Sequence, residues 1–357
     1  MNKNFCLKKW VWSIPILFGM MTLGMNYQKE GTDLVGQVYT LSFLSKEQPL
    51  DLLFNITSQH HGLYYAIYAY LFSLFEIEPI SYIALVAFAY YFIFVFLFDK
   101  HIKNIQIDFL HKSDCTKILI IAICSFSPIY ICIARNLFAI VVLLVALYAF
   151  KKKFLTVGCL LSVIAYISHE GLLLIFTLLM LSLILNKFVL PKFNSVKTRN
   201  FMIIFVCIVL FFVGPFIFSL FGNYAMQNSI TSEKYNDLYI SSSAGDGFYK
   251  YVLILSMLGS LYALVVASLK NHSNNLINSI CITALFFVFA LFGQKIFMVQ
   301  RVMMFIPLFV GMSLLEVYQS KKLHFNIRNK ESILLLSCPA ILLAQLFFWR
   351  NTFFSFM

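Results

Sequence analysis

The chain has 357 residues, of which 61% are hydrophobic and 12% charged, and its formal net charge is +12. Soluble domains carry about a quarter charged residues, so this composition excludes an ordinary soluble enzyme. Lysine and arginine gather in short clusters between apolar runs, as in membrane proteins that keep these residues in the cytoplasm, and we expect no nucleic-acid partner.

Apolar runs of about 18 or more residues recur along the chain, and each is long enough to cross a bilayer as a helix. The backbone must satisfy its own hydrogen bonds in lipid, and the runs lack the alternation of a membrane barrel. We therefore predict an all-α polytopic membrane protein with about eleven transmembrane helices and one short re-entrant or interfacial helix. Residues 1–357 are expected to form a single membrane-embedded domain.

The first apolar run, Trp10–Met25, follows three lysines and has no small-residue cleavage site after it. It is expected to be an uncleaved span with the N-terminus in the cytoplasm. Residues 26–61 are more polar and predict the first outer loop. Gly62–Phe75 is apolar and rich in tyrosine, but its 14 residues are too few for an ordinary span, so it is the expected short helix.

Basic residues then set the direction of the later spans. They predict that the loops 99–117, 187–200 and 319–331 are cytoplasmic, while the polar segment 222–249 forms a second outer loop. The expected spans after the short helix are Pro79–Phe98, Ile118–Ala134, Asn136–Phe150, Phe154–Ser168, Leu172–Asn186, Phe201–Phe221, Tyr251–Leu269, Leu276–Gly293, Val302–Tyr318 and Ser332–Trp349.

The stretch from Arg135 to Glu170 carries the clearest chemical signal. Two apolar runs flank the three lysines 151–153, and the far ends of the runs carry Arg135 and the pair His169-Glu170. If the lysines turn on the cytoplasmic side, these ionisable groups meet on the outer side. Ionisable groups at membrane depth are costly, so they are usually functional or paired.

Two arginines are candidates for binding a lipid-linked diphosphate. Arg135 precedes a short apolar run, and Arg301, beside Gln300, precedes another. Arginine suits bidentate contact with phosphate, and arginines on the outer side run against the usual charge bias. The alternative is that each arginine only extends to the outer headgroups.

His169 lies at the tip of a tight apolar hairpin and is a candidate proton acceptor or hydrogen-bond donor. The alternative is a helix-end histidine bonded to backbone. Glu170 is an alternative base, and only one of two adjacent residues is expected to face a cavity. Asp33, in the first outer loop, is a weaker candidate. No histidine, cysteine or carboxylate set has metal-ligand spacing, so we expect no metal and no cofactor.

The sequence resembles the EpsG-like branch of the Wzy-type polysaccharide polymerases. The resemblance rests on Gly31-Thr32-Asp33 with Tyr39 downstream, on the block from Arg135-Asn136 to His169, and on Gln300-Arg301. Asn136 stands where the family usually has glutamine, and Gly171 where it usually has serine.

This resemblance implies a GT-C-like protein of the bacterial cytoplasmic membrane that polymerises undecaprenyl-diphosphate-linked oligosaccharides into O-antigen, capsular or exopolysaccharide on the outer face. It implies a metal-independent glycosyltransferase reaction, with a chain-length regulator and a flippase as partners besides the lipid bilayer. The residues implied to bind the diphosphate and the saccharide are Arg135, Arg301, Gln300, Asn136 and Tyr39, and those implied in catalysis are His169, Glu170 and Asp33.

Three alternatives remain open. An O-antigen ligase would use similar chemistry but transfer the chain to lipid A core. A flippase would carry charged residues in both halves of a central cavity, whereas here they gather toward the outer end. A membrane O-acetyltransferase would need an inner histidine that faces acyl-CoA, and the sequence offers none at that place.

Overall fold

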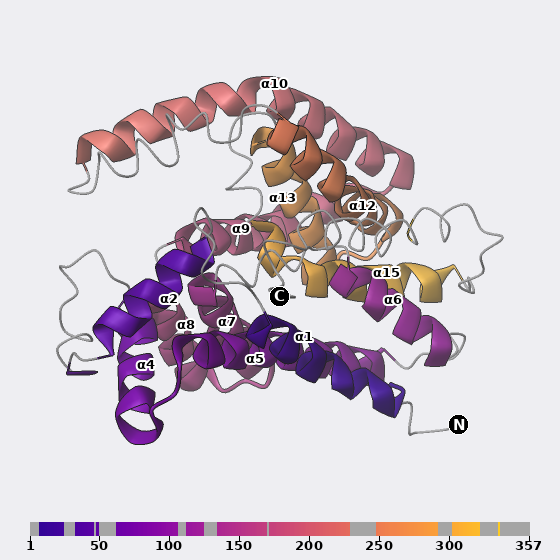
Figure 1. Cartoon of the computed structure of the whole chain (residues 1–357). Helices are drawn as coiled ribbons and strands as arrows, with labels where there is room; N and C mark the ends of the chain where they lie inside the picture. Colours follow the sequence, from indigo (N-terminus) through magenta and orange to yellow (C-terminus); the bar gives the residue numbers. More distant parts are fainter. Residues whose placement is uncertain are drawn as a thin grey trace. The chain divides into compact units, whose positions relative to one another are not determined.

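The structure, a computed structural model, is helical throughout its regular elements (Figure 1). It describes residues 7–24, 33–45, 48–49, 62–105, 112–124, 134–169, 171–228, 248–291, 302–321 and 335. Within these ranges there is no strand, which confirms the all-α prediction.

Four helical segments in the described part of the chain are long and apolar enough to cross a membrane: Pro79–Asn104, Ala134–Lys151, Leu172–Lys192 and Val196–Gly214. The membrane class is thereby supported, while the number of spans stays a prediction. The α-helices are α1 Ile14–Leu23, α2 Asp33–Leu44, α4 Gly62–Phe75, α5 Pro79–Asn104, α6 Lys112–Cys124, α7 Ala134–Lys151, α8 Leu155–Ser168, α9 Leu172–Ile184, α10 Val196–Asn228, α12 Phe248–Lys270, α13 Leu276–Leu291 and α15 Pro307–Ser320. A 3-10 helix, Lys9–Ser13, precedes α1, and a π-helix, Leu185–Val189, continues α9.

The predicted first outer loop, residues 26–61, contains the helix α2, which was not anticipated from the sequence; that this segment lies outside the membrane stays a prediction. Gln37, Leu41 and Leu44 are buried on one face of this helix. Their spacing of four and three residues is that of an amphipathic helix. The apolar content of the segment was too low to indicate a span, and the helical period within it was overlooked.

Several helices run beyond their predicted ends. α5 continues past Phe98 to Asn104 and carries an ion pair between Asp99 and Lys103 one turn apart. α6 begins at Lys112, so the predicted 99–117 loop is helical at both ends. α10 continues to Asn228, into the predicted 222–249 loop, of which residues 229–247 lie outside the described ranges. Hydropathy locates the apolar part of a helix, not the turns that extend into polar surroundings.

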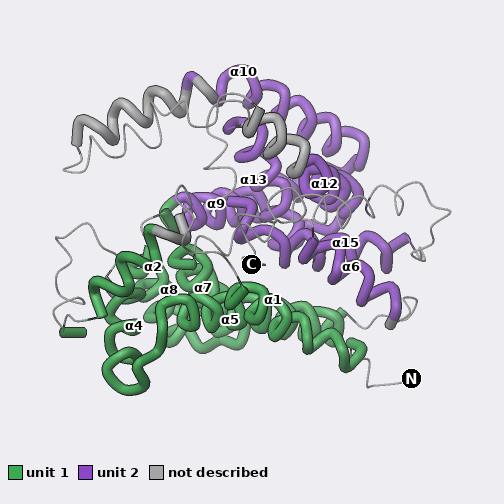
Figure 2. The backbone as a smooth tube through the Cα atoms, in the orientation of Figure 1, with its two compact units in different colours: residues 1–106, 127–173, 342–357 green, residues 107–126, 174–341 purple. Residues whose placement is uncertain are grey.

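The chain forms two compact units (Figure 2). Unit 1 contains residues 1–106, 127–173 and 342–357, and unit 2 contains residues 107–126 and 174–341. That the two units make up one membrane-embedded domain stays a prediction.

Unit 1 is built around α5 and the hairpin of α7 and α8. α5 packs against α1 and α7, and α4 packs against α2 and α8. The hairpin turns at Lys152 and Lys153, and Lys153 has a φ of 66°, the left-handed conformation that ends many helices. The predicted hairpin around the three lysines is therefore confirmed.

Unit 2 is centred on α13, which packs against α10, α12 and α15. Gly214 of α10 meets the backbone of Ala290 so closely that a Cβ there would lie 2.4 Å from the Ala290 carbonyl oxygen. Small residues let membrane helices approach in this way. This contact fixes the distance between α10 and α13 at that level.

A polar cluster joins three chain segments at one end of unit 2. Arg199, in the first turn of α10, donates from Nη2 to the Asn271 carbonyl oxygen (2.6 Å), and the Asn271 amide donates to Glu316 of α15 (2.9 Å). We call Arg199, Asn271, His272 and Glu316 the Arg199 cluster. It brings the starts of α10 and α13 and the end of α15 to one level, in agreement with the prediction that 187–200 and 319–331 share a side.

Candidate functional site

Arg135 lies in the first turn of α7, where its guanidinium meets the tyrosine-rich helix α4. The guanidinium carbon lies 5.8 Å from the ring centre of Tyr65, and the group also hydrogen-bonds with the Tyr65 side chain. A guanidinium over an aromatic face gains about 0.5–2 kcal/mol, more where water is excluded. α4 therefore fixes the direction in which Arg135 points.

Tyr64, the neighbour of Tyr65, anchors α4 in unit 1. Its buried ring lies 5.1 Å from the Tyr82 ring and 5.8 Å from the Phe138 ring, measured between centroids. The Tyr82 hydroxyl donates to the Tyr64 carbonyl oxygen at 3.0 Å. These contacts attach α4 to α5 and α7 and hold its tyrosines beside Arg135.

Three polar atoms at this place are buried and have no hydrogen-bond partner within the described ranges: Tyr64 Oη, Arg135 Nε and Asn136 Oδ1. A buried polar atom left unsatisfied costs about 1–3 kcal/mol. A phosphate oxygen could accept from Nε, and a sugar hydroxyl could donate to Oδ1. We name Tyr64, Tyr65, Arg135 and Asn136 the Arg135 site.

His169 follows α8 directly and is buried, with 5% of its surface exposed. Its Nδ1 accepts a hydrogen bond from the Gly171 backbone N–H at 2.7 Å. A neutral imidazole that accepts at Nδ1 carries its proton at Nε2. In this arrangement the neutral ring can donate from Nε2, and whether His169 acts as a donor or as a base stays a prediction.

Arg135 and His169 lie at the same end of the α7–α8 hairpin. Arg135 is about 24 Å of helix from Lys151, and His169 follows about 20 Å of α8. Because the two helices pack along each other from their shared turn, their far ends reach similar heights. The sequence predicted that Arg135 and His169 lie at the same level, and within unit 1 both lie at the same end of the α7–α8 hairpin.

The other expected site residues are not brought to this place by the described structure. Glu170, Gln300 and Arg301 lie outside the described residues, as does the side chain of Asp33, whose backbone begins α2. Tyr39, on the same helix, is 74% exposed. The structure therefore places Tyr39 on the surface of unit 1 and not among the buried groups of the Arg135 site.

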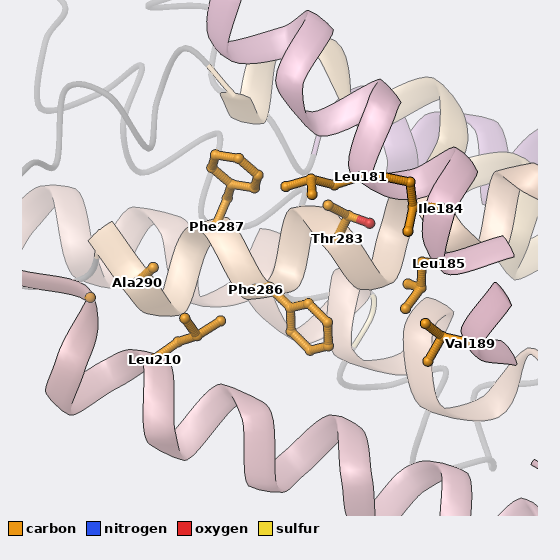
Figure 3. A pocket seen from close by; sticks show the side chains of 10 residues that line it. Leu181, Ile184, Leu185, Val189, Leu210, Thr283, Phe286, Phe287 and Ala290 are labelled. Atoms are coloured by element: carbon orange, nitrogen blue, oxygen red, sulfur yellow. The ribbon is translucent and has the colours of Figure 1, made fainter. Parts of the chain in front are cut away.

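Unit 2 contains an apolar cavity of about 360 Å³ between α9 with its π-helix, α10 and α13 (Figure 3). Its one polar side chain, Thr283, donates its hydroxyl to the Ser279 carbonyl oxygen at 2.8 Å, which leaves only its methyl group for the cavity. Such a lining suits a hydrocarbon chain. The lining residues are Leu181, Ile184, Leu185, Val189, Leu210, Gly214, Thr283, Phe286, Phe287 and Ala290.

The sequence model of the EpsG family matches residues 9–356, nearly the whole chain. The chain belongs to the EpsG family. This is the family of Wzy-type polysaccharide polymerases, and the resemblance stated from the sequence is confirmed. No curated protein and no solved structure matches the chain.

Two features of this EpsG-family chain escaped the sequence reasoning. Tyr64 and Tyr65 were noted only as part of a tyrosine-rich run. Four tyrosines within one short helix are already a sign that the helix packs through aromatic contacts. Glu316, the second feature, lies in an otherwise apolar run, where a carboxylate is stable only when it is paired or hydrogen-bonded. In the part of the chain that the structure describes, no group of three or more histidine, cysteine, aspartate or glutamate side chains is placed to hold a metal ion.

Proposed function

We propose that this EpsG-family protein polymerises undecaprenyl-diphosphate-linked oligosaccharide repeat units into O-antigen, capsular or exopolysaccharide. The observation that supports this most is the Arg135 site, where a guanidinium is held by Tyr65 at the end of the α7–α8 hairpin. A held guanidinium matches the geometry of phosphate and stabilises negative charge on it.

In the proposed reaction, a hydroxyl of one lipid-linked unit attacks the anomeric carbon of the sugar on the growing chain. A new glycosidic bond forms, the bond from that carbon to the lipid diphosphate breaks, and the diphosphate leaves with the bonding electrons. Arg135 stabilises the diphosphate, and Arg301 with Gln300 would supply a second contact. The hydroxyl proton passes to a base.

His169 enters this proposal as the donor to an oxygen of the substrate, because its Nδ1 already accepts from Gly171. The base is then Glu170 or Asp33, and a carboxylate is suited to that role. Asn136 and Tyr39 remain the proposed saccharide contacts, Asn136 by its buried amide oxygen and Tyr39 by its exposed ring.

We also propose that the apolar cavity of unit 2 takes up part of the hydrocarbon chain of a lipid. Its lining is hydrocarbon throughout, since the Thr283 hydroxyl is occupied by its own helix. A π-helix turn forms part of its wall, and such turns are frequent at functional sites.

The proposed setting is the bacterial cytoplasmic membrane, with the N-terminus in the cytoplasm, about eleven spans in a GT-C-like arrangement, and the reaction on the outer face. A flippase would supply lipid-linked units to that face, and a chain-length regulator would act on the product. No metal or other cofactor takes part in the proposed reaction.

The test uses the purified protein in liposomes that contain one lipid-linked repeat unit and no other glycan acceptor. We expect a ladder of polymer lengths, and Arg135→Lys should abolish the ladder while leaving the protein folded, since lysine keeps the charge but loses the planar fork. Transfer that occurs only when lipid A core is added would establish a ligase instead. Movement of the lipid across the bilayer without a new bond would establish a flippase.

A further inference from the structure

Three lysines surround a hollow at the other end of α7 from Arg135. The hollow has a volume of about 270 Å³ and is lined by Lys100 and Asn104 of α5, Tyr148 and Lys151 of α7, and Lys152 in the turn that follows. All five residues belong to unit 1. We call them the lysine pocket.

Two of the three ammonium groups rest on aromatic rings. Lys100 Nζ lies 5.4 Å from the centre of the Phe96 ring, and Lys152 Nζ lies 5.8 Å from that of Tyr148. The two rings contact each other nearly at right angles, with centroids 5.6 Å apart. This aromatic pair holds a cation from α5 and one from the turn after α7 at one place.

The carboxylates nearby are engaged elsewhere. Asp99, which precedes Lys100, pairs with Lys103 and accepts the Leu7 backbone N–H. Among the described residues, no carboxylate pairs with Lys100, Lys151 or Lys152. Three like charges around one small hollow repel one another, and an anion in the hollow would convert this repulsion into attraction.

The end of α7 does not need these lysines as caps. The carbonyl oxygens of Tyr148, Ala149 and Phe150 already accept backbone N–H groups from the turn at 2.9–3.0 Å. Lys153 takes a positive φ of 66° there, a conformation that glycine or asparagine adopts at lower cost. The ammonium groups are therefore available for a ligand.

We propose that the lysine pocket binds a phosphate ester. Three lysine ammonium groups match the charge of the phosphate, while the Asn104 amide and the Tyr148 hydroxyl can hydrogen-bond to oxygens of the ester. The pocket is about 24 Å of helix from Arg135, so it is separate from the proposed diphosphate site. Its ligand comes either from the headgroup of an anionic phospholipid or from a soluble phosphate ester, and the lipid is favoured because the pocket closes the ends of two membrane-spanning helices.

The experiment measures ligand binding by native mass spectrometry and thermal stabilisation of the purified full-length chain. One arm uses phosphatidylglycerol, with phosphatidylcholine as the uncharged reference, and the other uses glycerol 3-phosphate without added lipid. The pocket variant is the triple substitution Lys100→Gln, Lys151→Gln and Lys152→Gln. The matched control, Lys187→Gln, Lys192→Gln and Lys197→Gln, removes the same charge from unit 2.

We expect the pocket variant to lose at least about tenfold in affinity for phosphatidylglycerol, because its three lysines line one hollow and each contributes about 1 kcal/mol toward an anionic ligand held there. The control should lose less than about twofold, because its three lysines do not line this hollow. Substituting arginine at positions 100, 151 and 152 should restore binding of phosphatidylglycerol. Such a rescue would show that the pocket is still folded and that its positive charge is what binds the ligand. If the pocket variant lost affinity for glycerol 3-phosphate but kept its affinity for phosphatidylglycerol, the ligand would be a soluble phosphate ester. Equal losses in pocket variant and control, or no loss in either arm, would overturn the proposal.

Discussion

At the scale of single residues, Arg135 and Tyr65 form a pair whose members can be altered separately. Tyr65→Phe keeps the ring under the guanidinium and removes the hydroxyl that hydrogen-bonds with it. We expect polymer synthesis to fall about tenfold, because a hydrogen bond to a charged group contributes about 1.5 kcal/mol. Tyr70→Phe is the control, since Tyr70 is on the same helix but 56% exposed. Equal activity of the two variants would show that the phenol does not position Arg135.

The role of His169 as a donor can be tested by comparing a substitution that keeps a nitrogen donor with one that removes it. In His169→Gln the amide nitrogen lies near the position of Nε2 and can still donate, whereas His169→Ala removes the donor. We expect the glutamine variant to retain most of its polymerisation and the alanine variant to lose about 100-fold, as when an oxyanion donor is removed. The measurement is the ratio of single units to polymer. Equal and severe loss in both would return His169 to the role of base.

At the scale of helices, the contact between α10 and α13 leaves no room for a side chain. Gly214→Ala would place a Cβ 2.4 Å from the Ala290 carbonyl oxygen, and relief of such overpacking costs about 1–3 kcal/mol. The control is Gly36→Ala in α2, where a Cβ meets nothing within 4 Å and alanine favours the helix. We expect the thermal midpoint in detergent to fall for Gly214→Ala only. A midpoint unchanged by both substitutions would mean that α10 shifts freely along α13.

The Arg199 cluster predicts a pH dependence of stability. Partial desolvation of the exposed His272 ring, followed by the charges of Arg199 and Lys321, lowers the pKa of His272 below its ordinary 6.5. As the pH falls through 6.5, the unfolded chain takes up a proton that the folded chain does not, so the free energy of unfolding decreases. His272→Gln should flatten this part of the profile and leave stability above pH 7 nearly unchanged. A wild-type thermal midpoint that stays constant from pH 7.5 to about 5.5 would contradict this reading.

Helices were easier to predict from the sequence than their contacts. The hairpin around the three lysines and the short helix Gly62–Phe75 follow from apolar runs and lysine positions alone, and the structure has both. α2 was missed because its apolar face is only one side of a polar segment. The link between Tyr65 and Arg135 joins residues 70 positions apart, and nothing in the local pattern of either stretch specifies its partner.

At the scale of the whole molecule, the orientation in the membrane can be tested with single labelled cysteines, two positions in unit 1 and one in unit 2. In a background without the eight native cysteines, Lys152→Cys and Lys192→Cys should react with an impermeant reagent only after the cells are opened. Ser42→Cys, on the exposed face of α2, should react in intact cells. Labelling of Lys152→Cys in intact cells would reverse the faces and place Arg135 on the cytoplasmic side.

The length of α10 has a consequence for the segment that follows it. Its 33 residues extend about 50 Å, whereas the hydrocarbon of a bilayer is about 30 Å thick. The sequence of the helix stays apolar as far as Phe221 and becomes more polar over its last residues, 222–228, which add about 10 Å of helix. We expect these last two turns to set the height above the bilayer at which residues 229–247 begin. Deleting four residues from this polar end should lower that starting point by about 6 Å and leave the apolar crossing unchanged.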